Sequence, residues 1–193
     1  RKILIENKSY DSKKVLITVD DAFRSFYDNG WKILKEKKIP FILFFNTREV
    51  NANNPNYMTW DQVREIHNSK IGTIGGHSFS HEYLVNKSES EIKEDLEKSH
   101  KDFLRELSFR PKYFSYPFGE YSSTFKKIVK EFNYELAFGQ HSGVIDNSKD
   151  LLIKYNQAFI ENTEEIGYSP GYIRDLGLDI LLEKDYDVIV MLD

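Results

Sequence analysis

Short apolar runs alternate along this chain with segments whose apolar residues recur at helical spacing. Strands are predicted for the apolar runs 15–19, 41–45, 71–74, 113–116, 136–138 and 187–192. Helices are predicted over 23–34 and 125–132 from this spacing, and over 59–68 and 88–107 from capping-box sequences followed by apolar stripes. The alternation is typical of βα units around a mainly parallel sheet, so an α/β fold is expected.

No repeat, low-complexity segment or linker divides the chain into parts. Its 193 residues suffice for one substantial core, so a single domain over residues 1–193 is predicted. The Asn-rich segment 51–56 is predicted to be an exposed loop, because Asn and Pro favour turns. Residues 142–185 show no clear pattern, and no element is predicted there.

The composition excludes several classes of function. The chain has 40% hydrophobic and 15% aromatic residues, as globular domains do, and its net charge of -4 comes from interleaved acidic and basic residues. A nucleic-acid partner is therefore not expected. No apolar run reaches the roughly 20 residues that span a bilayer, so no transmembrane segment is predicted. Because the chain has no cysteine, any metal must be held by His, Asp or Glu.

Residues that can carry chemistry follow several of the predicted strands. Asp20 and Asp21 end the first strand, and His77 and His81 come directly after the third. The carboxyl ends of parallel strands gather at one edge of a sheet, where loops build sites. A carboxylate and two imidazoles make a three-ligand set for a divalent ion and leave one position for water. Zinc is the first candidate, and cobalt, nickel and manganese suit the same ligands.

Each of these residues also has a structural alternative. Asp20 and Asp21 would act as caps if the following helix began near Phe23, since Asp is a favoured N-cap residue. His77 and His81 would be hydrogen-bonded loop residues without any metal. The acidic pair followed by the His-x-x-x-His pair, in this order, favours the metal site over these alternatives.

The remaining candidates are single residues and one turn. His141 lies between two glycines and is either a catalytic residue or a surface turn residue, and the Pro and Gly of segment 116–119 are enough to explain an ordinary turn. Trp60 is expected to pack in the core rather than to stack on sugar. His67 and His100 are expected to be solvated helix residues.

Three motifs resemble those of the polysaccharide deacetylases, also called the NodB-homology or carbohydrate esterase family 4. They stand in this chain as Thr18-Val-Asp-Asp-Ala22, His77-Ser-Phe-Ser-His81 and Ser115-Tyr-Pro-Phe-Gly119, and the resemblance covers residues 14–141. The resemblance implies a distorted (β/α) barrel, a divalent metal cofactor and an N-acetylated polysaccharide or oligosaccharide as substrate.

The resemblance also implies a role for each matching residue. The implied metal ligands are Asp21, His77 and His81, the implied general base is Asp20, and the implied substrate contacts are Tyr116, Pro117 and Phe118, with a backbone N–H near Phe118 as oxyanion donor. Neighbouring strand residues point to opposite faces, so only one of the two aspartates is expected to hold the metal unless the backbone bends.

The chain departs from the family pattern at three positions. Ala22 replaces the usual Gly, and Ser115 replaces the Arg that orients the base in many relatives, with Arg110 as a nearby substitute. Leu192 falls where the family's terminal motif has the His that acts as general acid. By its position after a strand, His141 is then the best remaining acid.

The expected activity is metal-dependent hydrolysis of N-acetyl groups on a polymer of N-acetylhexosamine, which releases acetate and a free amine. The third motif and the missing Arg are closer to exopolysaccharide de-N-acetylases, such as those acting on poly-N-acetylglucosamine, than to chitin or peptidoglycan enzymes. Three alternatives stay open: a carbohydrate-binding pseudo-enzyme, an O-acetyl esterase, and a hydrolase of small cyclic amides. The family's usual substrates imply a periplasmic or cell-surface location, with a signal segment outside this chain. The oligomeric state is not predicted.

Overall fold

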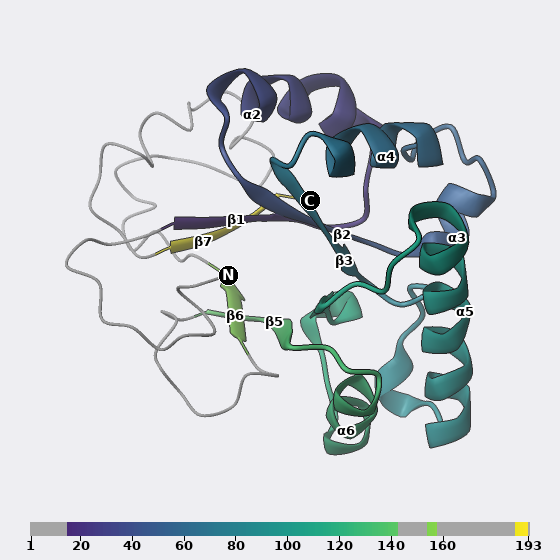
Figure 1. Ribbon diagram of the computed structural model, residues 1–193. Coiled ribbons are helices and arrows are strands. Elements are labelled where there is room, and N and C mark those ends of the chain that lie inside the picture. Colours follow the sequence, from purple (N-terminus) through teal and green to yellow (C-terminus); the bar gives the residue numbers. More distant parts are fainter. Residues whose placement is uncertain (1–14, 143–153, 158–187, 193) are drawn as a thin grey trace.

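Strands and helices alternate along the chain as the sequence predicts (Figure 1). The computed structural model describes residues 15–142, 154–157 and 188–192. The strands are β1 (Val15–Val19), β2 (Phe41–Phe45), β3 (Gly72–Gly76), β4 (Tyr113–Ser115), β5 (Leu136–Ser142), β6 (Lys154–Gln157) and β7 (Val188–Leu192). The α-helices are α2 (Trp31–Lys37), α3 (Thr47–Asn51), α4 (Trp60–Asn68), α5 (Glu89–Leu107) and α6 (Ser123–Glu131). A π-helical turn, η1 (Phe26–Gly30), and two 3-10 turns, η2 (Leu84–Asn86) and η3 (Pro117–Gly119), complete the set.

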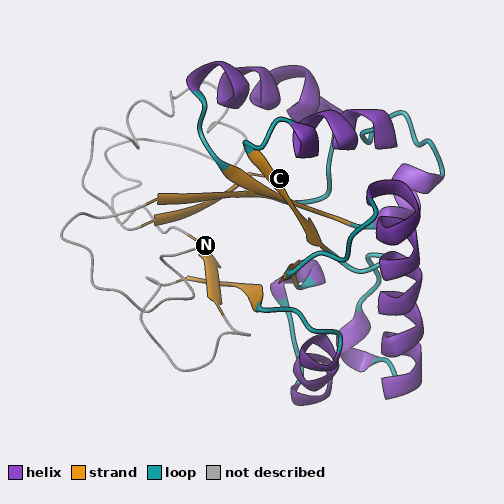
Figure 2. Cartoon of the chain, in the orientation of Figure 1, coloured by secondary structure: helices purple, strands orange, loops and turns teal. Residues whose placement is uncertain are grey.

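The strands form one curled parallel sheet. Their order is β6-β5-β4-β3-β2-β1-β7, and every neighbouring pair is parallel. Helices α2, α4, α5 and α6 form an arc around the outer side of the curve (Figures 1 and 2). The predicted α/β fold is confirmed, and the carboxyl ends of the strands lie at one edge, as such a sheet requires. Among the described helices, none is both long and apolar enough to cross a bilayer.

Strand β2, in the interior of the sheet, is apolar on both faces because both are covered. All five residues of β2 are buried, as is typical of a strand inside a parallel sheet. Phe45 packs edge to face on Trp60 and Phe103, at ring-centroid distances of 5.6 and 5.2 Å, so the prediction that Trp60 is a core residue is confirmed. In β3, a Cβ atom at Gly76 would lie 2.6 Å from the Tyr134 hydroxyl. Gly76 therefore lets the chain pass close to Tyr134 just before His77.

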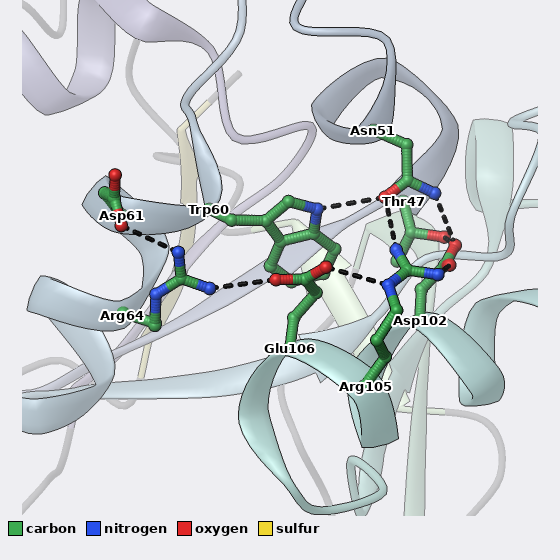
Figure 3. Close-up of polar contacts among 8 residues, drawn as sticks. All are labelled: Thr47, Asn51, Trp60, Asp61, Arg64, Asp102, Arg105 and Glu106. Carbon is green, nitrogen blue, oxygen red and sulfur yellow. Dashed lines mark hydrogen bonds and ion pairs between the residues drawn. The ribbon is translucent and has the colours of Figure 1, made fainter.

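Polar side chains also tie the helices together on the outer side. The buried carboxylate of Asp102 on α5 accepts hydrogen bonds from Thr47 Oγ1 at 2.6 Å, Asn51 Nδ2 at 2.7 Å and Arg105 Nη1 at 2.7 Å (Figure 3). Asn51 Oδ1 in turn accepts from Trp60 Nε1 at 2.9 Å. The prediction that residue 51 lies in an exposed loop is wrong, because Asn51 ends helix α3 and links α3, α4 and α5.

Both capping boxes are confirmed, whereas other predicted boundaries shift. Thr59 and Ser88 accept backbone N–H bonds at the starts of α4 and α5, and Gln62 and Glu91 complete the two boxes. The predicted helix over 23–34 is divided into the π-helical turn η1 and α2. The short helix α3 and the strand β6 were not predicted, because both are too short or too polar for a periodic pattern.

The expectation that His100 is solvated is wrong. Its side chain is 4% exposed, and Nε2 lies 3.0 Å from the hydroxyl of Tyr134, which is also buried. Burial lowers the pKa of His100 from 6.5 to about 4, and the nearby charge of Arg110 adds to this effect. The imidazole is therefore neutral in the folded chain at neutral pH.

The folded chain should lose stability in mild acid because of His100. The unfolded chain takes up a proton at this residue near pH 6.5 and the folded chain only near pH 4, so the contribution is complete above pH 6.5 and lost as the pH falls towards 4. The loss should reach about 3 kcal/mol in the free energy of unfolding, measured by urea unfolding across this range. A His100→Gln variant should lack this part of the pH dependence, and parallel curves for the two proteins would contradict the assignment.

Candidate metal and catalytic site

The two adjacent aspartates after β1 both face the same histidine. Asp20 Oδ2 lies 4.0 Å and Asp21 Oδ1 3.8 Å from His77 Nε2. Neighbouring side chains of a straight strand would point to opposite faces. Here the backbone bends, because Asp21 and Ala22 have the left-handed φ values of 68° and 55°. Glycine adopts this conformation without strain, which accounts for the family's usual Gly where this chain has Ala22.

The two histidines of the loop after β3 complete a three-residue cluster with Asp21. His81 Nε2 lies 3.4 Å from Asp21 Oδ1, and one nitrogen or oxygen from each of Asp21, His77 and His81 lies within 4.8 Å of the others. His77 Nδ1 lies 2.7 Å from the backbone carbonyl of Ser115. Since a carbonyl only accepts, Nδ1 carries the proton and Nε2 presents its lone pair to the carboxylates, as metal-binding histidines do.

The local environment keeps His81 in the form that binds metals. Burial lowers the pKa of His81, and the neighbouring imidazole of His77 lowers it further, while Asp21 and Asp20 act in the opposite direction. A neutral imidazole is the metal ligand. The donor set of two imidazoles and one carboxylate, with its nitrogen and oxygen atoms turned toward one point, therefore fits a divalent ion of the zinc type.

Ser115 takes the place beside Asp20 for which Arg110 was the expected substitute. Ser115 Oγ donates a hydrogen bond of 2.9 Å to Asp20 Oδ2, and both side chains are buried. Arg110 lies instead near His100, whose pKa its charge lowers. Sequence patterns do not predict this contact, because it joins residues 95 positions apart. A polar side chain at the end of a strand was the one signal that pointed to Ser115.

The third motif places only one of its three expected substrate contacts at the surface. Tyr116 is 1% exposed and packs among aromatic side chains, including Phe114 and Phe125, and Pro117 is also buried. The expectation that these two side chains touch a polymer is corrected by their burial. Phe118 is 51% exposed, has a left-handed φ of 58°, and lies 4.7 Å from the His81 ring between centroids.

A second exposed aromatic residue beside the site was not predicted. Tyr83 is 41% exposed, its ring lies 5.9 Å from that of Phe118 between centroids, and its hydroxyl contacts Glu120. Its position two residues after His81 was the available signal. We call Phe118 and Tyr83 the aromatic pair; the Phe118 ring packs on His81, and the Tyr83 ring packs on Phe118.

The candidate general acid, His141, and the position where the family has its acid, Leu192, lie on two other strands. His141 belongs to β5, but its side chain lies outside the described residues. Leu192 belongs to β7 and pairs with Val19, the residue before Asp20. The backbone at Leu192 therefore lies beside the end of β1, where the family's terminal His is expected. As for the capping alternative, the helical turn η1 has Ser25 as its N-cap, not Asp20 or Asp21.

Comparison with known proteins identifies the family. The family model "Polysaccharide deacetylase" matches residues 7–137, which is more than half of the chain. The chain belongs to the polysaccharide deacetylase family. Among curated members of this family, the poly-beta-1,6-N-acetyl-D-glucosamine N-deacetylase of Staphylococcus aureus is 25% identical over 156 residues, which cover 75% of this chain and 54% of the relative. The chain thus spans about half the length of the curated relatives it matches.

Solved structures of polysaccharide deacetylases share the fold. IcaB from Ammonifex degensii aligns with a TM-score of 0.74 and 22% identity over 84% of this chain and 75% of IcaB. BA3943 from Bacillus anthracis, a pseudoenzyme of carbohydrate esterase family 4, aligns with a TM-score of 0.64 and 17% identity over 94% of this chain and 55% of BA3943. The expected distorted (β/α) barrel of the NodB type is therefore confirmed as a curled, parallel half-barrel.

Proposed function

We propose that this polysaccharide deacetylase is a metal-dependent enzyme that hydrolyses N-acetyl groups of a poly-N-acetylhexosamine, releasing acetate. The single observation that carries the proposal is the convergence of Asp20, Asp21, His77 and His81 at the ends of β1 and β3. The similarity to a poly-beta-1,6-N-acetyl-D-glucosamine N-deacetylase supports an exopolysaccharide substrate. We further propose that residues 1–193 form a single domain and that the protein acts in the periplasm or at the cell surface.

The side chains in and around the cluster can each take a different role in amide hydrolysis. Asp21, His77 and His81 would hold a divalent ion, most simply zinc, and such an ion supplies Lewis acidity toward the acetyl carbonyl and makes water easier to ionise. Asp20 takes the proton from the attacking water, because its carboxylate faces the cluster while Asp21 already supplies the carboxylate ligand. Ser115 holds the Asp20 carboxylate in place through its hydrogen bond.

Two further groups are needed when the carbon–nitrogen bond breaks. The backbone N–H near Phe118 is proposed to donate to the oxyanion, since the left-handed turn there lies beside His81. His141 on β5 is proposed as the acid that protonates the leaving amine. With Leu192 in the family's usual acid position, no other residue is proposed for this step.

The aromatic pair is proposed to bind a sugar ring next to the reacting residue, since exposed aromatic faces beside a site suit the apolar face of a pyranose. A Tyr83→Ala variant should raise the KM for N-acetylglucosamine oligomers about tenfold, the equivalent of about 1.4 kcal/mol, and leave kcat nearly unchanged. Leu104→Ala, which removes a similarly exposed apolar side chain from α5, is the matched control. An equal KM for the two variants would exclude a contact between Tyr83 and the substrate.

The proposed activity is tested by acetate release from N-acetylglucosamine oligomers. The protein is stripped of metal with a chelator and reloaded with zinc, cobalt, nickel or manganese. Acetate release that depends on reloading supports the proposal and identifies the ion. Tight metal binding without acetate release from the oligomers would overturn it. Acetate release from acetylated esters, or ring opening of small cyclic amides, would then identify one of the other hydrolase activities.

A carbohydrate-binding pseudo-enzyme is the second candidate function. The observation that favours it is Leu192 beside the end of β1, in the place of the usual acid. The family also contains pseudoenzymes, of which BA3943 shares this fold. Oligomer binding that persists when no acetate is released, measured by calorimetry on the metal-loaded protein, would favour this second function.

A further inference from the structure

The loop that carries both histidines has a strained backbone. Residues 77–81 connect β3 to the segment before η2, and Ser78 and His81 have left-handed φ values of 66° and 55°. Side chains with a Cβ atom adopt this region at a cost of about 1–3 kcal/mol each, and they keep it only where the surroundings determine it. The loop itself supplies part of the support for this conformation, since Ser78 Oγ accepts a hydrogen bond of 2.9 Å from the His81 N–H.

A carboxylate from α5 holds the middle of the same loop. Asp95 is 8% exposed, and its two oxygens accept from the backbone N–H groups of Phe79 at 2.7 Å and Ser80 at 3.1 Å. Hydrogen bonds to a charged acceptor in a buried setting are among the stronger ones. On the other side, the N–H of Arg48 on α3 donates to the Phe79 carbonyl at 3.1 Å. The peptide groups between the two histidines are thus held from two helices.

We propose that Asp95 is a positioning residue of the metal centre, which sets the separation and direction of His77 and His81 through the loop backbone. The inference rests on the proposed metal-dependent function. His77 is fixed at its ring by the Ser115 carbonyl, whereas the loop must bring His81 back toward Asp21. Without the carboxylate, the strained loop relaxes, and His81 Nε2 leaves the position that lies 3.4 Å from Asp21.

Helix α5 offers a matched control for this role. Asp102 lies two turns further along the helix and is also a buried carboxylate with several hydrogen bonds. Its partners are side chains of Thr47, Asn51 and Arg105 (Figure 3), not the backbone of the histidine loop. Replacing either Asp by Asn removes a buried carboxylate, but only the change at Asp95 removes one of the two oxygens that accept from the loop and places an NH2 donor against a backbone N–H.

The test is a cobalt titration of the metal-free protein, monitored by the visible absorption of the bound ion. Urea unfolding of the metal-free form measures the stability of each variant separately. Asp95→Asn should weaken cobalt binding about tenfold to a hundredfold and alter the absorption spectrum, as changes behind metal ligands do. Asp102→Asn should change the affinity by less than about twofold although it lowers stability. Asp95→Glu keeps the carboxylate, and its cobalt affinity should lie between that of Asp95→Asn and that of the unchanged chain.

The outcomes separate this inference from the proposed function. Unchanged affinity and spectrum in folded Asp95→Asn, or the same loss in Asp102→Asn, overturn the positioning role while the metal centre stands. If the unchanged chain binds no cobalt, the proposed metal centre is contradicted, and the positioning role is contradicted with it. Should Asp95→Asn fail to fold, Asp95→Glu decides, because the longer side chain displaces the carboxylate that holds the loop. Affinity and spectrum equal to those of the unchanged chain would show that the position of this carboxylate does not set the histidines, and would overturn the inference.

Discussion

An Asp20→Asn variant should release acetate from N-acetylglucosamine oligomers about a thousandfold more slowly than the unchanged chain, while it keeps its metal. The amide has nearly the same shape as the carboxylate, and its oxygen can still accept the 2.9 Å hydrogen bond from Ser115 Oγ. It cannot take a proton from water at neutral pH. The loss should therefore appear in kcat, with little change in KM.

The measurement combines initial rates with the metal content of each variant. Ser115→Ala is the companion variant, because it keeps the carboxylate and removes only its hydrogen bond. A hydrogen bond to a charged group contributes about 1.5–3 kcal/mol, so Ser115→Ala should lower kcat by roughly tenfold or more, and less than Asp20→Asn does. If Asp20→Asn keeps more than about a tenth of the activity, the general base is another group.

The part of the site that the sequence predicts consists of residues close together along the chain. Asp20 and Asp21 are adjacent, and His77 and His81 are four residues apart in one loop, so a strand pattern followed by polar residues was enough to find them. The parallel sheet then brings both pairs to one edge. The bend that turns both aspartates toward His77 depends on two left-handed residues, which no periodic pattern reveals.

The contacts that support the site are not local and were not predicted. Ser115 ends β4 and Asp20 follows β1, with β3 and β2 between them in the sheet order. Only the curl of the sheet brings these two side chains within hydrogen-bond distance, and curvature is a property of the whole sheet. Asp95 lies in a helix that the sequence predicts from its capping box and apolar stripe, but its partners are backbone groups of a distant loop, which no such pattern indicates.

Buried polar residues explain the two clearest errors of the sequence analysis. Asn51 was assigned to an exposed loop because Asn and Pro favour turns, and His100 was expected to be a solvated residue of its helix. Each is buried or partly buried with polar partners: Asn51 with Asp102 and Trp60, and His100 with Tyr134. Sequence patterns identify apolar faces, but they do not reveal which polar residue finds a partner across the fold.

A His81→Ala variant should lose metal affinity by more than about a hundredfold, because loss of a direct ligand exceeds the effect of changing a group behind one. Acetate release should then fall to the level of the chelator-stripped protein at equal metal concentration. His67→Ala is the matched control: it removes the same side chain from α4, where His67 stacks on Phe109 with ring centroids 4.9 Å apart.

Comparison of these two variants tests the ligand set apart from the fold. His81 is partly exposed at the end of its loop, so its loss should leave the unfolding of the metal-free protein nearly unchanged. The difference between the unfolding free energies with and without saturating metal should then be large for His67→Ala and small for His81→Ala, because an ion that binds only the folded state stabilises it in proportion to the logarithm of its affinity. Equal metal stabilisation of both variants would contradict His81 as a ligand and would show that other groups bind the ion.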